Sequence, residues 1–196
     1  MANATNPESL PKTVTHHLSM LHKQCNWVDK PHAQPSARNT TALRLARLAL
    51  PAQSRVSMDY SACCHCKKIG VSLTLARPIE SYQPRACDCS FCQLHAVTYI
   101  SALDGALSIH PTGALRQLKQ GSAQATFWQC AACDQIIAAT HAFGDGIDPL
   151  RGAVNGQLFS HQYQLPAPVS VSPQRLTPAD KPKRWLSSWL TVNFNT

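Results

Sequence analysis

Residues 64–76 read Cys-His-Cys-Lys-Lys-Ile-Gly-Val-Ser-Leu-Thr-Leu-Ala, which joins a close cysteine pair to an alternating stretch. Cys64 and Cys66 are two residues apart, so an extended backbone presents both sulfurs on one face. Apolar side chains then recur with a period of two, which indicates a half-buried strand: Ile69, Val71, Leu73 and Leu75. The stretch therefore predicts a β-rich domain that carries one half of a metal site near its start.

Further candidate strands follow along the chain, at residues 97–102, 107–110, 114–119, 125–129, 136–142 and 153–158. Turn residues that include glycine separate several of them, at 104–105, 111–113 and 119–121. Strands this short and this closely spaced predict small antiparallel sheets. We therefore expect a mainly β fold with short helical segments.

Seven of the nine cysteines fall into three clusters: Cys64 and Cys66; Cys87, Cys89 and Cys92; Cys130 and Cys133. Zinc prefers four tetrahedral ligands, and a close cysteine pair supplies two of them. If the first and last pairs share one ion, that site is closed, and three cysteines remain for a second zinc with an open fourth position. Spacing alone also permits the first pair to share an ion with two of the middle cysteines. Two zinc ions per chain are predicted.

Other uses of the cysteines are less consistent with the sequence. A disulfide scaffold is not expected, because the N-terminal residues lack the apolar core of a secretory signal. A redox-active pair would explain one cluster but not three. The second site could instead be a structural one completed by His95, Asp88 or Cys63. Cys25 and Cys63 are otherwise expected to be buried or incidental thiols.

The composition changes near residue 58. Residues 1–57 contain no glycine and carry +5 of the formal net charge of +8. We expect this part to be a disordered or mis-started extension, with translation beginning at Met58, followed by one domain over 58–165. A tail over 166–196 completes the chain, and it is expected to form a short helix because apolar residues repeat at helical spacing: Trp185, Leu186, Trp189 and Leu190.

The charge and hydropathy of the chain bear on its partners and location. The zinc-binding part is weakly basic, and its thiolates would neutralise it further, so nucleic acid is not an expected partner. No apolar run approaches the roughly 18 residues of a membrane-spanning helix. We expect a soluble, cytoplasmic protein. The sequence contains no signal for its oligomeric state.

The order of the clusters, with their flanking residues, forms a pattern that covers residues 58–158. Met-Asp-Tyr at 58–60 precedes the first pair, Cys-Asp-Cys-Ser-Phe-Cys occupies 87–92, and Trp-Gln-Cys-Ala-Ala-Cys occupies 128–133. A weaker match, Val-Asn-Gly-Gln-Leu, closes the pattern at 154–158. This part of the chain resembles the glutathione-dependent formaldehyde-activating enzyme family, which includes the centromere protein V domain.

The resemblance implies a β-tent fold of small antiparallel sheets stapled by zinc. It implies a structural zinc at Cys64, Cys66, Cys130 and Cys133, and a second zinc, the candidate for chemistry, at Cys87, Cys89 and Cys92. The implied activity is that of a carbon-sulfur lyase, which forms S-hydroxymethylglutathione from a small-molecule thiol, glutathione, and a small aldehyde, formaldehyde. His95, which follows Cys92 by three residues, is a candidate proton shuttle.

The chain departs from the family pattern at five positions. Lys67 and Asp134 stand where glycine usually follows each pair, and Gln93 and Leu94 replace a common basic pair. Ala96 replaces a frequent glycine. Two rival functions stay open at this point. One is a non-catalytic zinc module that binds protein or nucleic acid, and the other is a thiol-based metal or redox sensor.

Overall fold

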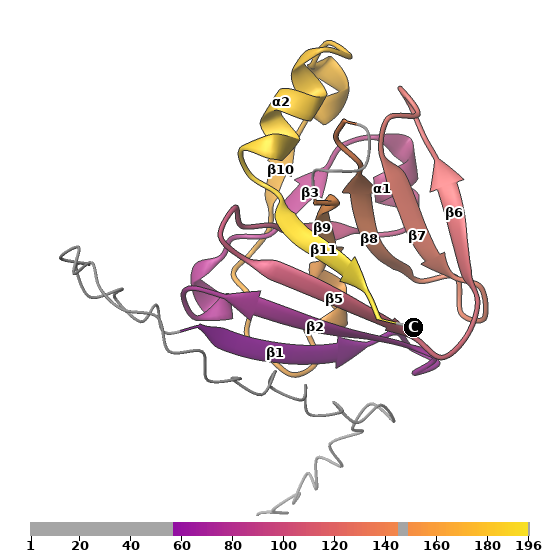
Figure 1. Cartoon of the computed structure of the whole chain (residues 1–196), viewed down its shortest axis with the longest axis vertical. Helices are drawn as coiled ribbons and strands as arrows, with labels where there is room; N and C mark the ends of the chain where they lie inside the picture. The colour runs from indigo at the N-terminus through magenta and orange to yellow at the C-terminus, as the bar shows by residue number, and fades with distance from the viewer. Residues whose placement is uncertain (1–56, 145–148, 196) are drawn as a thin grey trace, which may run out of the picture.

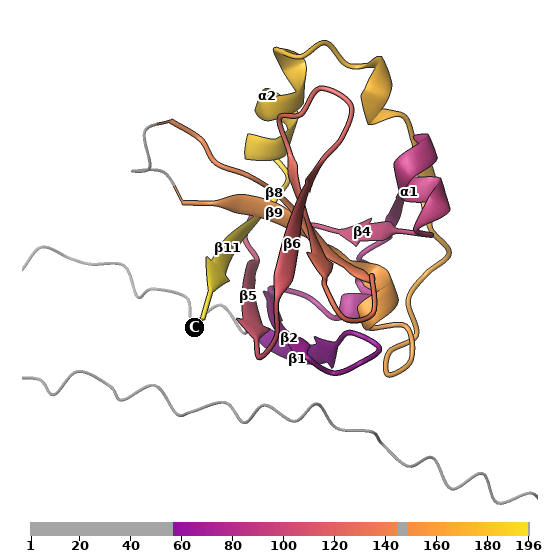
Figure 2. The same ribbon diagram turned by 90° about the vertical axis from the view of Figure 1, so that its right-hand side faces the viewer.

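The structure is a computed structural model that describes residues 57–144 and 149–195 (Figures 1 and 2). The extension expected over 1–57, with the thiol of Cys25, lies outside the described residues apart from position 57. The remaining chain is mainly β, as the sequence predicts.

The described residues form eleven strands and two α-helices. The strands are β1 (Met58–Cys63), β2 (Ile69–Leu75), β3 (Arg85–Cys87), β4 (Thr98–Ile100), β5 (Ala106–Pro111), β6 (Leu115–Lys119), β7 (Thr126–Cys130), β8 (Ile136–His141), β9 (Arg151–Asn155), β10 (Val169–Val171) and β11 (Leu190–Phe194). The α-helices are α1 (Ser90–Leu94) and α2 (Asp180–Leu186), and three 3-10 turns are η1 (Ile79–Ser81), η2 (Gly156–Leu158) and η3 (Pro173–Arg175). Neither α-helix is long or apolar enough to cross a membrane, within the part of the chain described.

Strand β9 is the point at which the sheet branches. Its residues 151–154 pair with β8 on one edge, whereas β11 and β4 share the other edge. One branch runs β1-β2-β5-β11-β9-β4-β3-β10, and the other adds β8, β7 and β6. Gly152 lies where the branches meet: a Cβ there would come within 2.8 Å of the Ala139 carbonyl oxygen and 2.7 Å of Val192 Cγ2. Only glycine permits this close approach of three strands.

Each stretch predicted as a strand contains one, although the last is cut short. Strand β9 ends at Asn155, and residues 156–158 form η2 instead, where the Asn155 side chain accepts a hydrogen bond from the Gln157 N–H at 3.0 Å. In β2 the predicted alternation is visible, since Val71, Leu73 and Leu75 are buried.

Two pairings in the sheet are parallel and depart from the antiparallel arrangement that the sequence predicts. β10 pairs with β3, and β11 pairs with β5, in parallel. Both parallel partners belong to residues 166–196. Strands this short, with partners far away in the sequence, have no local pattern that predicts a parallel pairing, because long-range packing decides the partner.

The C-terminal residues 166–196 are part of the sheet as well as the site of the expected helix. That helix, α2, ends at Leu186, and the chain turns so that Leu190 begins β11 between β5 and β9. Leu190 is fully buried and Val192 nearly so, alongside Leu107 and Ile109 of β5. Both views show α2 at the opposite end of the molecule from β1 and β2 (Figures 1 and 2).

Candidate metal centres

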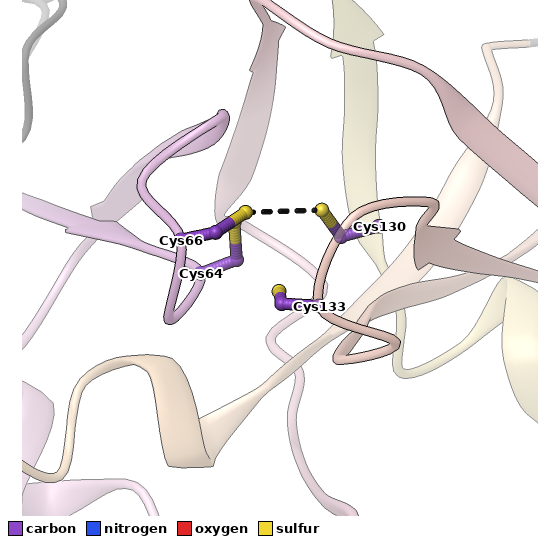
Figure 3. A group of neighbouring side chains, drawn as sticks. All are labelled: Cys64, Cys66, Cys130 and Cys133. Atoms are coloured by element: carbon purple, nitrogen blue, oxygen red, sulfur yellow. Dashed lines mark hydrogen bonds between the residues drawn. The ribbon is translucent and has the colours of Figure 1, made fainter.

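Two hairpins bring four cysteines together. Cys64 and Cys66 lie in the turn between β1 and β2, while Cys130 and Cys133 lie at the turn between β7 and β8. All four sulfurs lie within 4.8 Å of one another, and Cys66 Sγ is 3.5 Å from both Cys64 Sγ and Cys130 Sγ (Figure 3). The structure thus selects between the partitions that spacing leaves open: the two pairs face each other, and the middle cluster stands apart.

This four-cysteine group fits a tetrahedral metal ion. Zinc with bonds of about 2.3 Å to sulfur separates its ligands by about 3.8 Å, close to the observed 3.5 Å. Cys64 and Cys130 are buried in the core, and the Ile69 N–H donates to Cys64 Sγ at 3.3 Å. Such backbone donors stabilise thiolates. The group can therefore hold one metal ion that joins the two hairpins.

Each turn has a left-handed residue directly after its second cysteine. The Lys67 N–H donates to the Cys64 carbonyl at 2.8 Å, and the Asp134 N–H donates to the Cys130 carbonyl at 3.0 Å. Lys67 has a φ of 62° and Asp134 a φ of 58°, both in the left-handed region. This explains why glycine suits these positions, since a β-carbon is disfavoured there.

Lys67→Gly is therefore expected to raise the free energy of unfolding by about 0.5–1 kcal/mol. Asp134→Gly should gain less, because aspartate tolerates this conformation and Asp134 Oδ1 pairs with Arg116 Nη1 at 2.7 Å. Denaturant unfolding of the zinc-loaded variants measures both. A less stable Lys67→Gly would show that contacts of the lysine outweigh its backbone strain.

Without a cation, the four thiols do not ionise together. Burial raises the pKa of Cys64 to about 12. For Cys66, burial is outweighed by hydrogen bonds from the Lys68 N–H and from the Cys130 and Cys64 thiols, which lower its pKa to about 7. One thiolate therefore suppresses its neighbours, and a bound divalent ion would remove that penalty.

A second group contains Cys87, Cys89 and Cys92, whose sulfurs also lie within 4.8 Å of one another. Cys87 ends β3, Cys89 is the N-cap residue of α1, and Cys92 lies on that helix. The Cys92 thiol and the Cys89 N–H donate to Cys87 and lower its pKa to about 6, and the same contact raises the pKa of Cys92. Three convergent sulfurs fit a metal ion with one coordination position left open.

The residues proposed to complete this site are engaged elsewhere. The Asp88 carboxylate accepts from the Ser172 hydroxyl, and also from Gln174 Nε2 at 3.2 Å. His95 packs on Phe91 with 4.7 Å between ring centroids, and lines a different pocket, shared with Cys133. Cys63 is disulfide-bonded, so the expectation of an incidental thiol is wrong. Within residues 57–144 and 149–195, the second metal group consists of three cysteines.

Tyr99 is the polar side chain beside these cysteines. Its hydroxyl is 3.8 Å from Cys92 Sγ. Burial, with the sulfur of Cys92 as a lesser cause, raises the pKa of Tyr99, so the phenol keeps its proton. The role of His95 as a proton shuttle stays a prediction. Tyr99 lies beside the three cysteines, where a residue that exchanges protons with a bound substrate would have to lie.

The three-cysteine group opens into a pocket of about 290 Å³, called here the three-cysteine pocket. One face of the sheet forms the floor of this pocket. Arg85 and Cys87 are two residues apart in β3, so their side chains lie on this same face, and Tyr99 of β4 is paired with Arg85. Ala139 and Ala153 face each other across β8 and β9 and also line it. Because alanine side chains are small, they leave space above the sheet.

The C-terminal residues supply the opposite wall of the pocket. Lys181, Arg184 and Trp185 of α2 line it together with Trp189, which stacks on Trp185 at 4.7 Å between ring centroids. The hairpin of β6 and β7 holds this wall: Lys181 Nζ contacts Ser122 Oγ at 3.3 Å, and Gln124 Nε2 donates to the Pro178 carbonyl at 2.8 Å.

Sequence reasoning missed several of the lining residues. Arg85 could have been predicted to line the site, because it precedes Cys87 by two residues and therefore lies on the same face of a strand. Tyr99 lies in a predicted strand, but no pattern in the neighbouring sequence predicts its contact with Cys92. The sequence places Lys181 and Arg184 in a C-terminal tail, and only the packing of α2 brings them to the cysteines.

Comparisons with known proteins leave the family unassigned. No family model matches the sequence, and no curated protein matches it. A solved crystal structure of a Rhodobacter sphaeroides protein, from a structural genomics programme, is 20% identical, and the match covers 62% of this chain and 94% of that one, with a TM-score of 0.40. A likeness at this level carries no argument about function.

Proposed function

We propose that this chain is a zinc-dependent enzyme of the carbon-sulfur lyase type, which joins a small-molecule thiol to a small aldehyde. Glutathione and formaldehyde are the substrates that the family resemblance suggests. The observation that carries the proposal is the contrast between the two cysteine groups. Four sulfurs surround one site, whereas three surround the other and line a pocket of about 290 Å³.

The reaction is an addition that needs no oxidant. The substrate sulfur forms a bond to the aldehyde carbon, the carbonyl π bond breaks, and the proton of the thiol ends on the new hydroxyl oxygen. Zinc held by Cys87, Cys89 and Cys92 would favour the thiolate form of the substrate near neutral pH.

The chain's own residues supply position and a proton donor. The apolar walls of the three-cysteine pocket, including Phe91 and Phe127, exclude water from the reacting sulfur. Tyr99 Oη keeps its proton because it is buried, and it lies 3.8 Å from Cys92 Sγ. From there it can donate a hydrogen bond to the oxygen on which negative charge develops.

The test measures adduct formation with ¹³C-labelled formaldehyde and glutathione by NMR exchange spectroscopy. Zinc-loaded protein is expected to accelerate the exchange between free aldehyde and adduct above the spontaneous rate. Tyr99→Phe should slow the catalysed part by roughly tenfold to a hundredfold, with its zinc content unchanged.

Cobalt substitution gives a readout that does not depend on turnover. Adding a thiol should change the visible absorption of the cobalt form if the three-cysteine site accepts a fourth ligand. No acceleration and no spectral change would contradict the proposal and favour a non-catalytic zinc module. Zinc release on mild oxidation, without acceleration, would instead favour a redox sensor.

A further inference from the structure

Apart from the three cysteines, the charged side chains that line the three-cysteine pocket are all positive. Arg85, Lys181 and Arg184 contribute to its walls, and no aspartate or glutamate does so among the described residues. The rest of the lining is largely aromatic, aliphatic or thiol. A cationic set inside a mostly apolar pocket is expected to select the charge of its ligand.

Arg85 is held in place and forms no ion pair with a carboxylate of the residues that the structure describes. Its Nη1 donates to Ser101 Oγ at 2.9 Å, and its side chain is half-buried on the floor of the pocket. Arg184 lines the same pocket, so the pocket contains two guanidinium groups. Because arginine does not lose its proton in proteins, their positive charges repel each other.

Arg184 differs from its neighbour on the same helix. Lys183 is exposed and pairs with Asp180 Oδ1 at 3.3 Å. Arg184 lines the pocket and forms no ion pair with the carboxylates of residues 57–144 and 149–195. Helix α2 thus directs one cation towards solvent and another into the pocket.

We propose that Arg184 and Arg85, assisted by Lys181, bind a carboxylate carried by the substrate thiol. The planar guanidinium group matches the two oxygens of a carboxylate, and an anion between the two arginines offsets their repulsion. The inference rests on the proposed function, because it assigns the sulfur end of the ligand to the three-cysteine group. Helix α2, through Arg184 and Lys181, then contributes to substrate specificity together with Arg85 of β3.

The test compares small thiols that share an HS–CH2–CH2 chain and differ in the charge of their end group. Zinc-loaded full-length protein is titrated with 3-mercaptopropionate, 2-mercaptoethanol and cysteamine, and binding is followed by tryptophan fluorescence, since Trp185 and Trp189 line the pocket. We expect 3-mercaptopropionate to bind at least roughly tenfold more tightly than 2-mercaptoethanol, with cysteamine weakest. If the native protein binds the anionic and neutral thiols with equal affinity, the inference is overturned without any variant.

Arg184→Gln should reduce the preference for the anionic thiol to within roughly threefold, and Arg184→Lys should restore part of it. Lys183→Gln is the matched control, because it removes one positive charge from the same helix outside the pocket. It is expected to keep the full preference. The same loss in Lys183→Gln would show that the net charge of the helix, and not the pocket, is responsible.

A thiol-free probe separates this inference from the proposed function. 3-(Methylthio)propionate retains the carboxylate but has no thiol to ionise. If it binds in an Arg184-dependent manner while no thiol forms an adduct, the carboxylate site stands and the proposed function fails. If 2-mercaptoethanol forms adducts as well as 3-mercaptopropionate does, the proposed function stands and the carboxylate site fails.

Discussion

Cys130→Ser is expected to leave the chain unfolded at room temperature even with zinc present. Binding of a structural zinc is worth about 10–16 kcal/mol, as much as the whole stability of an ordinary domain, about 5–15 kcal/mol. Cys130 is fully buried, and its group joins the hairpin of β1 and β2 to that of β7 and β8. Losing one ligand removes that joint and places a hydroxyl in the core. Far-UV circular dichroism and metal analysis measure the result.

Cys89→Ser is the control for this prediction. Cys89 belongs to the group with three sulfurs and is only partly buried, at the start of α1. We expect this variant to fold, to lose one of two zinc ions and to lose the catalysed exchange of formaldehyde. Equal collapse of the two variants would contradict the division into a structural and a reactive site. Equal retention of both metals would contradict it as well.

Deleting residues 190–196 is expected to unfold the domain. This deletion removes β11, which bridges β5 and β9 in the middle of the sheet. It exposes both neighbouring edges and removes the buried side chains of Leu190 and Val192. Each such side chain contributes about 2–4 kcal/mol when it is large and fully enclosed, so the sum approaches the total stability of the domain.

Single substitutions measure how much individual side chains of this region contribute to stability. Leu190→Ala should lower the free energy of unfolding by about 2–5 kcal/mol, because the side chain is fully buried. Leu186→Ala is the matched control, since Leu186 lies four residues earlier and is 48% exposed. It should cost less than about 1 kcal/mol. A folded, zinc-binding protein after the deletion would show that residues 190–196 are dispensable for the fold.

The strands were predictable where their side chains alternate. β2 was visible because every second residue from Ile69 is apolar, and this pattern depends only on the pleat of one strand. β3 and β10, with three residues each, are too short for a period to emerge. The helical spacing of Trp185, Leu186, Trp189 and Leu190 predicts a helix that includes Leu190, whereas Leu190 begins β11. The burial of Leu190 between β5 and β9 overrides the pattern.

The metal ligands were predictable in a different way. A chelating pair depends on separations of two or three residues, so Cys64 with Cys66 and Cys130 with Cys133 could be recognised locally. Their partners could not be chosen locally, because the hairpins meet only after the sheet has formed. Lys67 and Asp134 illustrate the limit: the turn geometry overrides their preference for negative φ.

The sequence by itself determined that the chain is mainly β and that seven of its cysteines fall into clusters spaced so that they can hold metal ions. Both properties arise from spacings of a few residues along one segment. The tertiary structure alone decided that four sulfurs enclose one site while three face a pocket, and that Arg184 of α2 and Arg85 of β3 share that pocket. The physical reason is that these side chains meet through the branched sheet and the packing of α2, which bring together residues far apart in the chain.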